Sequence, residues 1–243
     1  MELTSTTAAG RNADPVVAAK QLVWNAWSDD GLVPDASVLA DDIEFHGPAP
    51  IGALHGRNDL LAEVYGPLSA AFPEARRNAY VFLGGEWNDE IWVAATGNMF
   101  GAMTGPWLGI PASGAPTTVR FGEFHRVVDG QVVEIRCLFD VLAVAAQAGH
   151  RLLPPVRRPD IPPGPDGDKG LCVGLQEQAE STVTLHLVND MLNGCNRLSD
   201  SDLSSMGMDA YWHDNMAWYG PWGVGTALGF EEFQADAQGP SVA

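Results

Sequence analysis

Apolar residues recur at helical spacing near the start of the chain. They mark one face of an amphipathic helix: Val16, Ala19, Val23 and Ala26. Asp14 supplies an N-cap oxygen just before Pro15, which suits the first helical position. The pattern therefore predicts a helix from about residue 15 to residue 28.

The next apolar positions alternate instead. Ile43 and Phe45 alternate with Glu44 and His46, which predicts a short strand that the residues Gly-Pro-Ala-Pro at 47–50 break. A second helix is expected from about residue 58 to residue 71, since Pro73 stops it.

The following residues change to a strand-like pattern, rich in aromatic and β-branched side chains. Four strands are predicted: 80–83, 90–100, 119–128 and 132–139. Asp129-Gly130 is a strong hairpin signal between the last two, and a short helix is expected over 141–148. Glycines interrupt the strands where a curved sheet would kink. Helices first and a meander afterwards indicate an α+β fold with a curved antiparallel sheet.

Six prolines lie between Pro154 and Pro165, which predicts a semi-extended linker. The pattern then restarts with a helix over about 180–192. Residues 220–229 repeat the glycine, proline and aliphatic spacing of residues 47–56, offset by 173. We interpret this recurrence as an internal repeat whose second copy is incomplete, because the second meander is missing.

Composition narrows the possible partners. The net charge of −18 repels nucleic acid and anionic lipid, and no apolar run is long enough to span a membrane. The first 13 residues lack the features of a signal peptide, so we expect a disordered tail and a cytoplasmic protein. The three cysteines have no zinc-ligand spacing.

The most specific local signal is Gly105-Pro106-Trp107-Leu108-Gly109-Ile110-Pro111 with Gly114. It precedes the hairpin Arg126–Glu134, then Asp140 and Gln147-Ala148-Gly149. This succession resembles the SnoaL-like polyketide cyclases (ester cyclases) of the nuclear transport factor 2-like superfamily.

The resemblance implies a cone, in which a curved antiparallel (mixed) sheet wraps a pocket that helices close. It implies a SnoaL-like domain over 14–150, a linker over 151–170 and an incomplete second SnoaL-like domain over 171–243. The implied activity is a cofactor-independent aldol cyclisation, or a related lyase or isomerase reaction, on a small apolar carbonyl-rich molecule. The position that matches the family's acid/base residue is Asp140.

Strand alternation adds further candidates. Phe121, Glu123 and His125 share one strand face. A pocket with histidines and carboxylates could perform acid–base chemistry, so the candidate catalytic residues are Asp140, His125, His46 and Glu123. The candidate substrate-binding residues are Trp24, Trp92, Phe121, Trp107 and Arg136. The histidines lack metal-ligand spacing, so no metal is expected, and the reaction that the resemblance implies needs no cofactor.

Each candidate also has a structural interpretation, in which Asp140 caps the helix after it and Glu123 pairs with an arginine. Two other functions stay open: a non-catalytic binding or interaction domain, and a hydrolase of an epoxide or ester. The second copy lacks a counterpart of Asp140, so any chemistry is expected in 14–150. Its apolar side chains need a partner, so we expect a homodimer, packing of the two copies on each other, or truncation of a longer tandem protein.

Overall fold

The computed structural model describes residues 14–27, 31–150, 152, 164–167, 169–200 and 202–239. The predicted N-terminal tail and most of the proline-rich linker lie outside these residues. The first part contains α1 (Pro15–Ala26), η1 (Ala36–Val38), β1 (Leu39–His46), β2 (Ala53–His55), α2 (Arg57–Leu60), the π-helix η2 (Leu61–Tyr65), α3 (Gly66–Ala71), β3 (Arg76–Trp87), β4 (Glu90–Ala102), β5 (Pro116–Val128), β6 (Gln131–Phe139) and α4 (Val141–Gln147). The second part contains α5 (Gln178–Cys195), η3 (Leu203–Met206), η4 (Met208–Ala210), β7 (Ala217–Trp218), β8 (Ala227–Leu228), α6 (Phe230–Phe233) and the π-helix η5 (Gln234–Gln238).

The larger sheet has the strand order β2-β1-β6-β5-β4-β3. Strands β3 to β6 form the predicted antiparallel meander, and β1 joins β6 in parallel, which makes the sheet mixed. The Asp129-Gly130 turn has positive φ at both residues, as a tight hairpin requires. The α+β class and the curved sheet predicted from the sequence are confirmed, and the sheet stays open rather than closing as a barrel.

Gly97 lies at an irregular point of this sheet. The β3–β4 register shifts between Ala79 and Val81, and a Cβ atom built on Gly97 would lie 2.0 Å from the carbonyl oxygen of Asn78. Only glycine permits this close approach of two backbones, so the predicted role of glycines in kinking the strands holds at this position.

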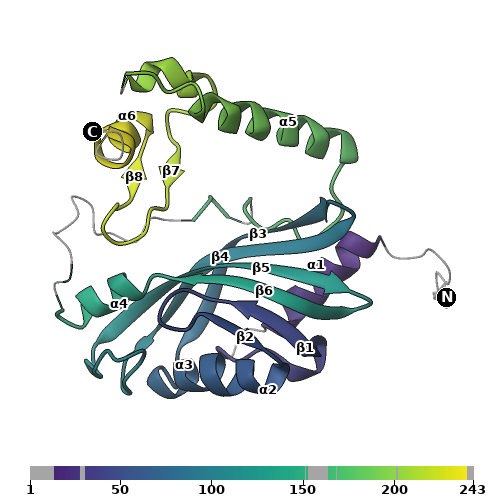
Figure 1. The fold of residues 1–243 in the computed structure, drawn as a ribbon, viewed down its shortest axis with the longest axis vertical. Helices are drawn as coiled ribbons and strands as arrows, with labels where there is room; N and C mark the ends of the chain where they lie inside the picture. Colours follow the sequence, from purple (N-terminus) through teal and green to yellow (C-terminus); the bar gives the residue numbers. More distant parts are fainter. Residues whose placement is uncertain are drawn as a thin grey trace, which may run out of the picture.

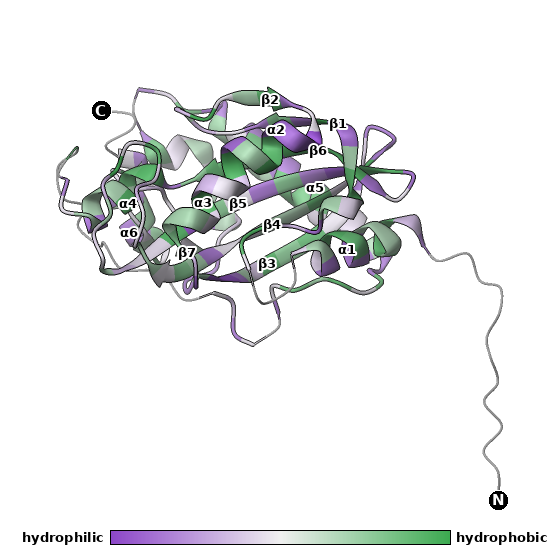
Figure 2. Cartoon of the chain, turned by 90° about the horizontal axis from the view of Figure 1, so that it is seen from below, coloured by the Kyte–Doolittle hydropathy of each residue, from purple (hydrophilic) through white to green (hydrophobic). Residues whose placement is uncertain are grey.

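The main core lies between one face of the sheet and the helices α1 to α3 (Figure 1). Helix α1 packs on β3 and β4, and buries Ala19, Val23 and Ala26, three of its predicted apolar positions. Both hydrophobic and hydrophilic residues occur along each helix and strand of the first part (Figure 2). Among the described residues, no helix is long and apolar enough to cross a membrane.

The segment before α5 packs on the first domain and is not a free part of the linker. Phe82 donates its backbone N–H to Gly170 and accepts one from Cys172, both at 2.7 Å. The buried Lys20 of α1 donates to the carbonyl oxygen of Gly174 and to Gln176. Residues 170–176 therefore cover the outer edge of β3, although the sequence pattern placed residue 171 at the start of the second copy.

The second part lies on the other side of the sheet, with α5, β7 and β8 opposite α2 and α3 (Figure 1). Its own core is small: Met216, Ala227, Phe233 and Ala237. Most of helix α5 is exposed, including apolar side chains such as Val183, Leu185 and Leu187.

Residues 216–239 repeat the order of secondary structure of residues 43–66. Trp218 pairs with Ala227 as Phe45 pairs with Leu54, 173 residues earlier. In both places a short helix leads directly into a π-helix, and the offset between the paired elements is again that of the sequence repeat. This shared geometry supports our proposal that the later segment is an internal repeat of the earlier one.

Candidate functional site

Strand β5 carries a row of buried polar side chains toward the core. Glu123 and His125 are fully buried and follow the buried Phe121 at alternate positions, as strand alternation predicted. Arg120 and Gly122 are the neighbours of Phe121 along the strand and therefore face the opposite side of the sheet.

Arg77 of β3 joins this row. Its Nη2 donates to Glu123 Oε2 at 2.6 Å, and the Nε2 atom of His125 lies 3.6 Å from the same oxygen. On the other side of the imidazole, Nδ1 lies 3.3 Å from the carbonyl oxygen of Val93. A carbonyl only accepts, so Nδ1 carries the proton and Nε2 presents its lone pair to the carboxylate. We call Arg77, Glu123 and His125 the inner cluster.

Several atoms of the inner cluster have no hydrogen-bond partner among the described residues. They are Arg77 Nε, Glu123 Oε1 and His125 Nε2, and the hydroxyl of Tyr65 nearby shares this property. Leaving a buried polar group unpaired costs about 1–3 kcal/mol. Most buried polar groups in proteins are paired, so these atoms are available to an ordered water or to a polar group of a ligand.

Aromatic rings enclose the inner cluster. Trp27, at the end of α1, lies with its ring centroid 4.6 Å from that of His125, and Arg77 lies 4.1 Å from the ring centroid of Phe121. Tyr65 ends the π-helix η2, and burial, followed by the negative charge of Glu123, raises the pKa of its hydroxyl well above the usual value. The site thus combines a charged pair, a neutral histidine and apolar walls.

The pKa of His125 is lowered to about 4, and burial is the largest cause. The charges of Glu123, which raises this pKa, and of Arg77, which lowers it, have smaller effects. The unfolded pKa is about 6.5, so the neutral folded histidine stabilises the protein fully above that pH, and this contribution is lost as the pH falls toward 4. When the pH falls from 7.5 to 5, the contribution of His125 to the free energy of unfolding should therefore fall by about 2 kcal/mol. Urea unfolding at both pH values should show that His125→Gln removes this pH dependence.

The exposed His55→Gln is the control, and it should keep the wild-type pH dependence. A His125→Gln variant whose stability falls with pH as steeply as that of the wild type would contradict the buried, neutral imidazole.

The structure places the candidate His46 away from the inner cluster. His46, Glu44 and Glu134 gather with Arg126 and Arg136 on the outer side of the sheet. Burial alone would raise the pKa of Glu134, but hydrogen bonds from the two arginines outweigh burial and lower it. Alternation defines two faces for each strand, and His46 lies on the face that does not contact the main core.

Among the described residues, Glu44, His46 and Glu134 have the spacing of metal ligands. Glu134 already accepts a hydrogen bond from each of the two guanidinium groups, whose positive charges oppose a cation. The donor set therefore fits an arginine–carboxylate network better than a metal ion.

The candidate binding residues also separate. Trp92 and Arg136 meet on the outer face, where the guanidinium lies 5.6 Å from the indole centroid. Trp24 is 37% exposed and packs edge-on against Phe82. Trp107 is buried in the core. Of the five candidates, Phe121 alone contacts the inner cluster.

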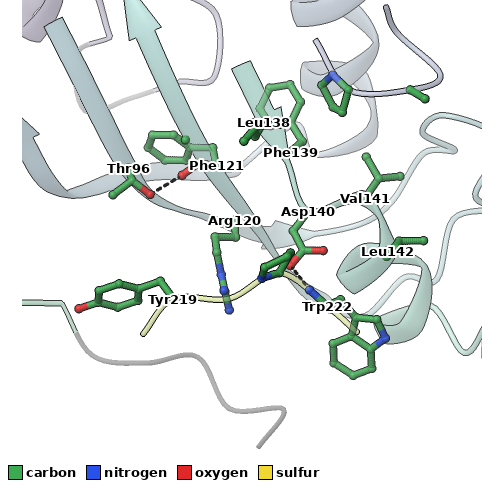
Figure 3. A pocket seen from close by; sticks show the side chains of 14 residues that line it. Thr96, Arg120, Phe121, Leu138, Phe139, Asp140, Val141, Leu142, Tyr219 and Trp222 are labelled. Atoms are coloured by element: carbon green, nitrogen blue, oxygen red, sulfur yellow. Dashed lines mark hydrogen bonds between the residues drawn. The ribbon is translucent and has the colours of Figure 1, made fainter. Parts of the chain in front are cut away.

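Asp140 caps α4 and borders a separate pocket (Figure 3). One carboxylate oxygen accepts from Ala143 N at 3.0 Å and the other from Trp222 N at 2.9 Å. The helix-capping interpretation of Asp140 therefore describes its contacts in this structure.

Sequence reasoning did not single out Arg77 and Tyr65. Arg77 precedes residue 80, where the strand pattern was expected to begin, and Tyr65 lies within an ordinary-looking helical segment. The sequence signal for Arg77 was Glu123 itself, because a buried carboxylate needs a cation beside it. Arg120 and Arg136 are nearer to Glu123 in the sequence than Arg77 is, so this signal did not select Arg77.

Solved structures with similar folds come from several bacteria. A protein from Jannaschia sp. CCS1, described as a SnoaL-like polyketide cyclase, is 22% identical, with a TM-score of 0.41 over 56% of this chain and 99% of that one. AclR from Streptomyces galilaeus, described as a hydroxylase, is 18% identical, with a TM-score of 0.42 over 56% and 94% of the two chains. A nuclear transport factor 2-like protein from Burkholderia pseudomallei is 18% identical, with a TM-score of 0.34 over 44% and 76%.

No curated protein matches the chain significantly. The family model for SnoaL-like polyketide cyclases, in contrast, matches residues 17–148, which run from α1 to the end of α4 and include the inner cluster and Asp140. This match covers more than half of the chain, so the protein belongs to the SnoaL-like polyketide cyclase family.

Proposed function

We propose that the first domain catalyses a cofactor-independent intramolecular aldol cyclisation of a small, apolar, carbonyl-rich molecule. The observation that supports this proposal is the inner cluster, in which Glu123 and His125 are fully buried yet each keeps one unpaired polar atom. Buried ionisable groups with a specific charge partner are typical of functional sites.

The inner cluster can supply every proton transfer that the reaction needs. Glu123 removes a proton from the carbon between two carbonyl groups, and Arg77 stabilises the resulting enolate through its positive charge. The enolate carbon attacks another carbonyl carbon of the same chain, which forms the ring. Glu123 then returns its proton to the new alkoxide, so the product is an isomer of the substrate.

His125 serves as a neutral hydrogen-bond acceptor in this proposal. Its low pKa keeps the ring uncharged at neutral pH, and its free Nε2 lone pair can accept a hydrogen bond from the protonated Glu123 or from a substrate hydroxyl. A neutral histidine avoids a second positive charge beside Arg77, which would weaken the basicity of Glu123.

The aromatic walls give the substrate its reactive shape. Trp27, Tyr65 and Phe121 surround the inner cluster, and a flexible polyketide-like chain that displaces Trp27 would fold against them. Holding the reacting carbons in contact can lower the activation barrier by on the order of 7 kcal/mol or more. Exclusion of water protects the enolate from side reactions.

The test incubates the full chain, without added cofactor, with a panel of linear β-polyketo esters that carry an aromatic group. Mass spectrometry and NMR identify the products. We expect a cyclic product with the mass of the substrate, or of the substrate less one water after dehydration. Cleavage of the ester into an acid and an alcohol would instead identify a hydrolase. Saturable binding without turnover would identify a binding domain, and either result would overturn the proposal.

A further inference from the structure

A cavity lies on the outer side of the sheet, where the turn at residues 219–222 meets the first domain (Figure 3). Its volume is about 480 Å³, within the range of small-molecule sites. Strand β5 supplies Arg120, Phe121 and Gly122; Arg120 and Gly122 face away from the inner cluster, whereas Phe121 borders both places. The charged residues that line the cavity, Arg120 and Asp140, are not those of the inner cluster.

Polar contacts hold the turn in place as one wall of this cavity. Arg120 donates a hydrogen bond to the carbonyl oxygen of Gly220, and Asp140 accepts one from the backbone N–H of Trp222. The ring of Tyr219 packs on that of Tyr80, with centroids 5.3 Å apart. Because these contacts join segments far apart in the sequence, the docked second part completes the wall of the cavity.

The lining determines the kind of ligand. Most of the wall is apolar, and its larger side chains are Leu138, Phe139, Val141, Leu142 and Trp222. Arg120 and Asp140 are the charged residues of the lining, and both Asp140 oxygens already accept hydrogen bonds. The guanidinium of Arg120 carries several N–H donors, and the carbonyl oxygen of Gly220 accepts from one of them. The remaining donors favour a ligand with acceptor oxygens.

We propose that this cavity, which we call the junction pocket, binds a small flat apolar molecule that carries a carboxylate. The rings of the ligand lie among the apolar side chains, and its carboxylate pairs with Arg120 in a charge-assisted hydrogen bond. Such a ligand contacts both parts of the chain and stabilises their docked arrangement. Nothing in this proposal depends on catalysis in the inner cluster.

The experiment is calorimetric titration of the full chain with 2-naphthoate, with naphthalen-2-ylmethanol as the matched neutral probe. We expect 2-naphthoate to bind saturably, and the neutral alcohol to bind at least about tenfold more weakly, since it lacks the charge-assisted bond. Failure of 2-naphthoate to bind, or equal affinities for the two probes, would overturn the proposal.

Variants locate the binding. Arg120→Met should raise the Kd for 2-naphthoate about tenfold or more, and Trp87→Ala, at a 64% exposed position outside the junction pocket, should leave it within about twofold. Leu142→Trp fills the cavity from a 40% exposed position without removing either polar contact, and should abolish binding even if Arg120→Met destabilises the chain. Equal effects of Leu142→Trp and Trp87→Ala would place the ligand elsewhere. Because binding is measured directly, the outcome is independent of the turnover assay.

Discussion

Replacing Glu123 by glutamine is expected to lower turnover by about 10²- to 10⁴-fold, which is the usual contribution of a general base. Glutamine has nearly the same shape and can still accept a hydrogen bond from Arg77, but it cannot take a proton from carbon. Turnover of the cyclising substrate, measured by product formation, is the readout. Circular dichroism and a thermal melt establish that the variant is folded.

Glu134→Gln is the matched control. Glu134 is also buried and paired with arginine, but it lies on the outer face of the sheet, so its loss should leave turnover within a fewfold of the wild type. Asp140→Asn provides the second comparison, because the family resemblance suggests Asp140 as the acid/base residue. A larger loss of turnover in Asp140→Asn than in Glu123→Gln would move the chemistry from the inner cluster to the junction pocket.

Local patterns in the sequence predict much of this fold. Alternation along 119–128 places Phe121, Glu123 and His125 on one face because β5 is regular over those residues. The Asp129-Gly130 turn determines the β5–β6 hairpin, with β6 following directly. The repeated glycine–proline segment likewise has positive φ at the equivalent glycines Gly52 and Gly225, which depends on the local chain.

The site could be predicted only in part. Alternation sorts side chains into two faces, but it does not reveal which face the helices cover, so His46 and Glu123 could not be separated. Whether they share a pocket depends on the parallel pairing of β1 with β6, a contact between residues 90 to 93 positions apart. The junction pocket depends on contacts of still longer range, such as that between Arg120 and Gly220.

Replacing Arg77 by methionine is expected to destabilise the protein by about 3–5 kcal/mol, as removal of one partner from a buried ion pair does. Arg77 donates to Glu123 at 2.6 Å, and both side chains are almost fully buried. Methionine keeps much of the apolar contact with Phe121 but leaves the carboxylate without its cation. The free energy of unfolding in urea, followed by tryptophan fluorescence at pH 7, measures the loss.

The double variant Arg77→Met/Glu123→Gln separates charge from packing. If the loss comes from an uncompensated carboxylate, the neutral amide should restore about 2 kcal/mol or more relative to Arg77→Met alone. Arg126→Met is the control on the outer face, where the 25% exposed side chain of Arg126 pairs with Glu134 in contact with solvent, so its loss should cost only about 1 kcal/mol. A double variant no more stable than Arg77→Met would mean that arginine stabilises the interior by packing. In that case Glu123 would not carry the buried charge on which the proposed chemistry depends.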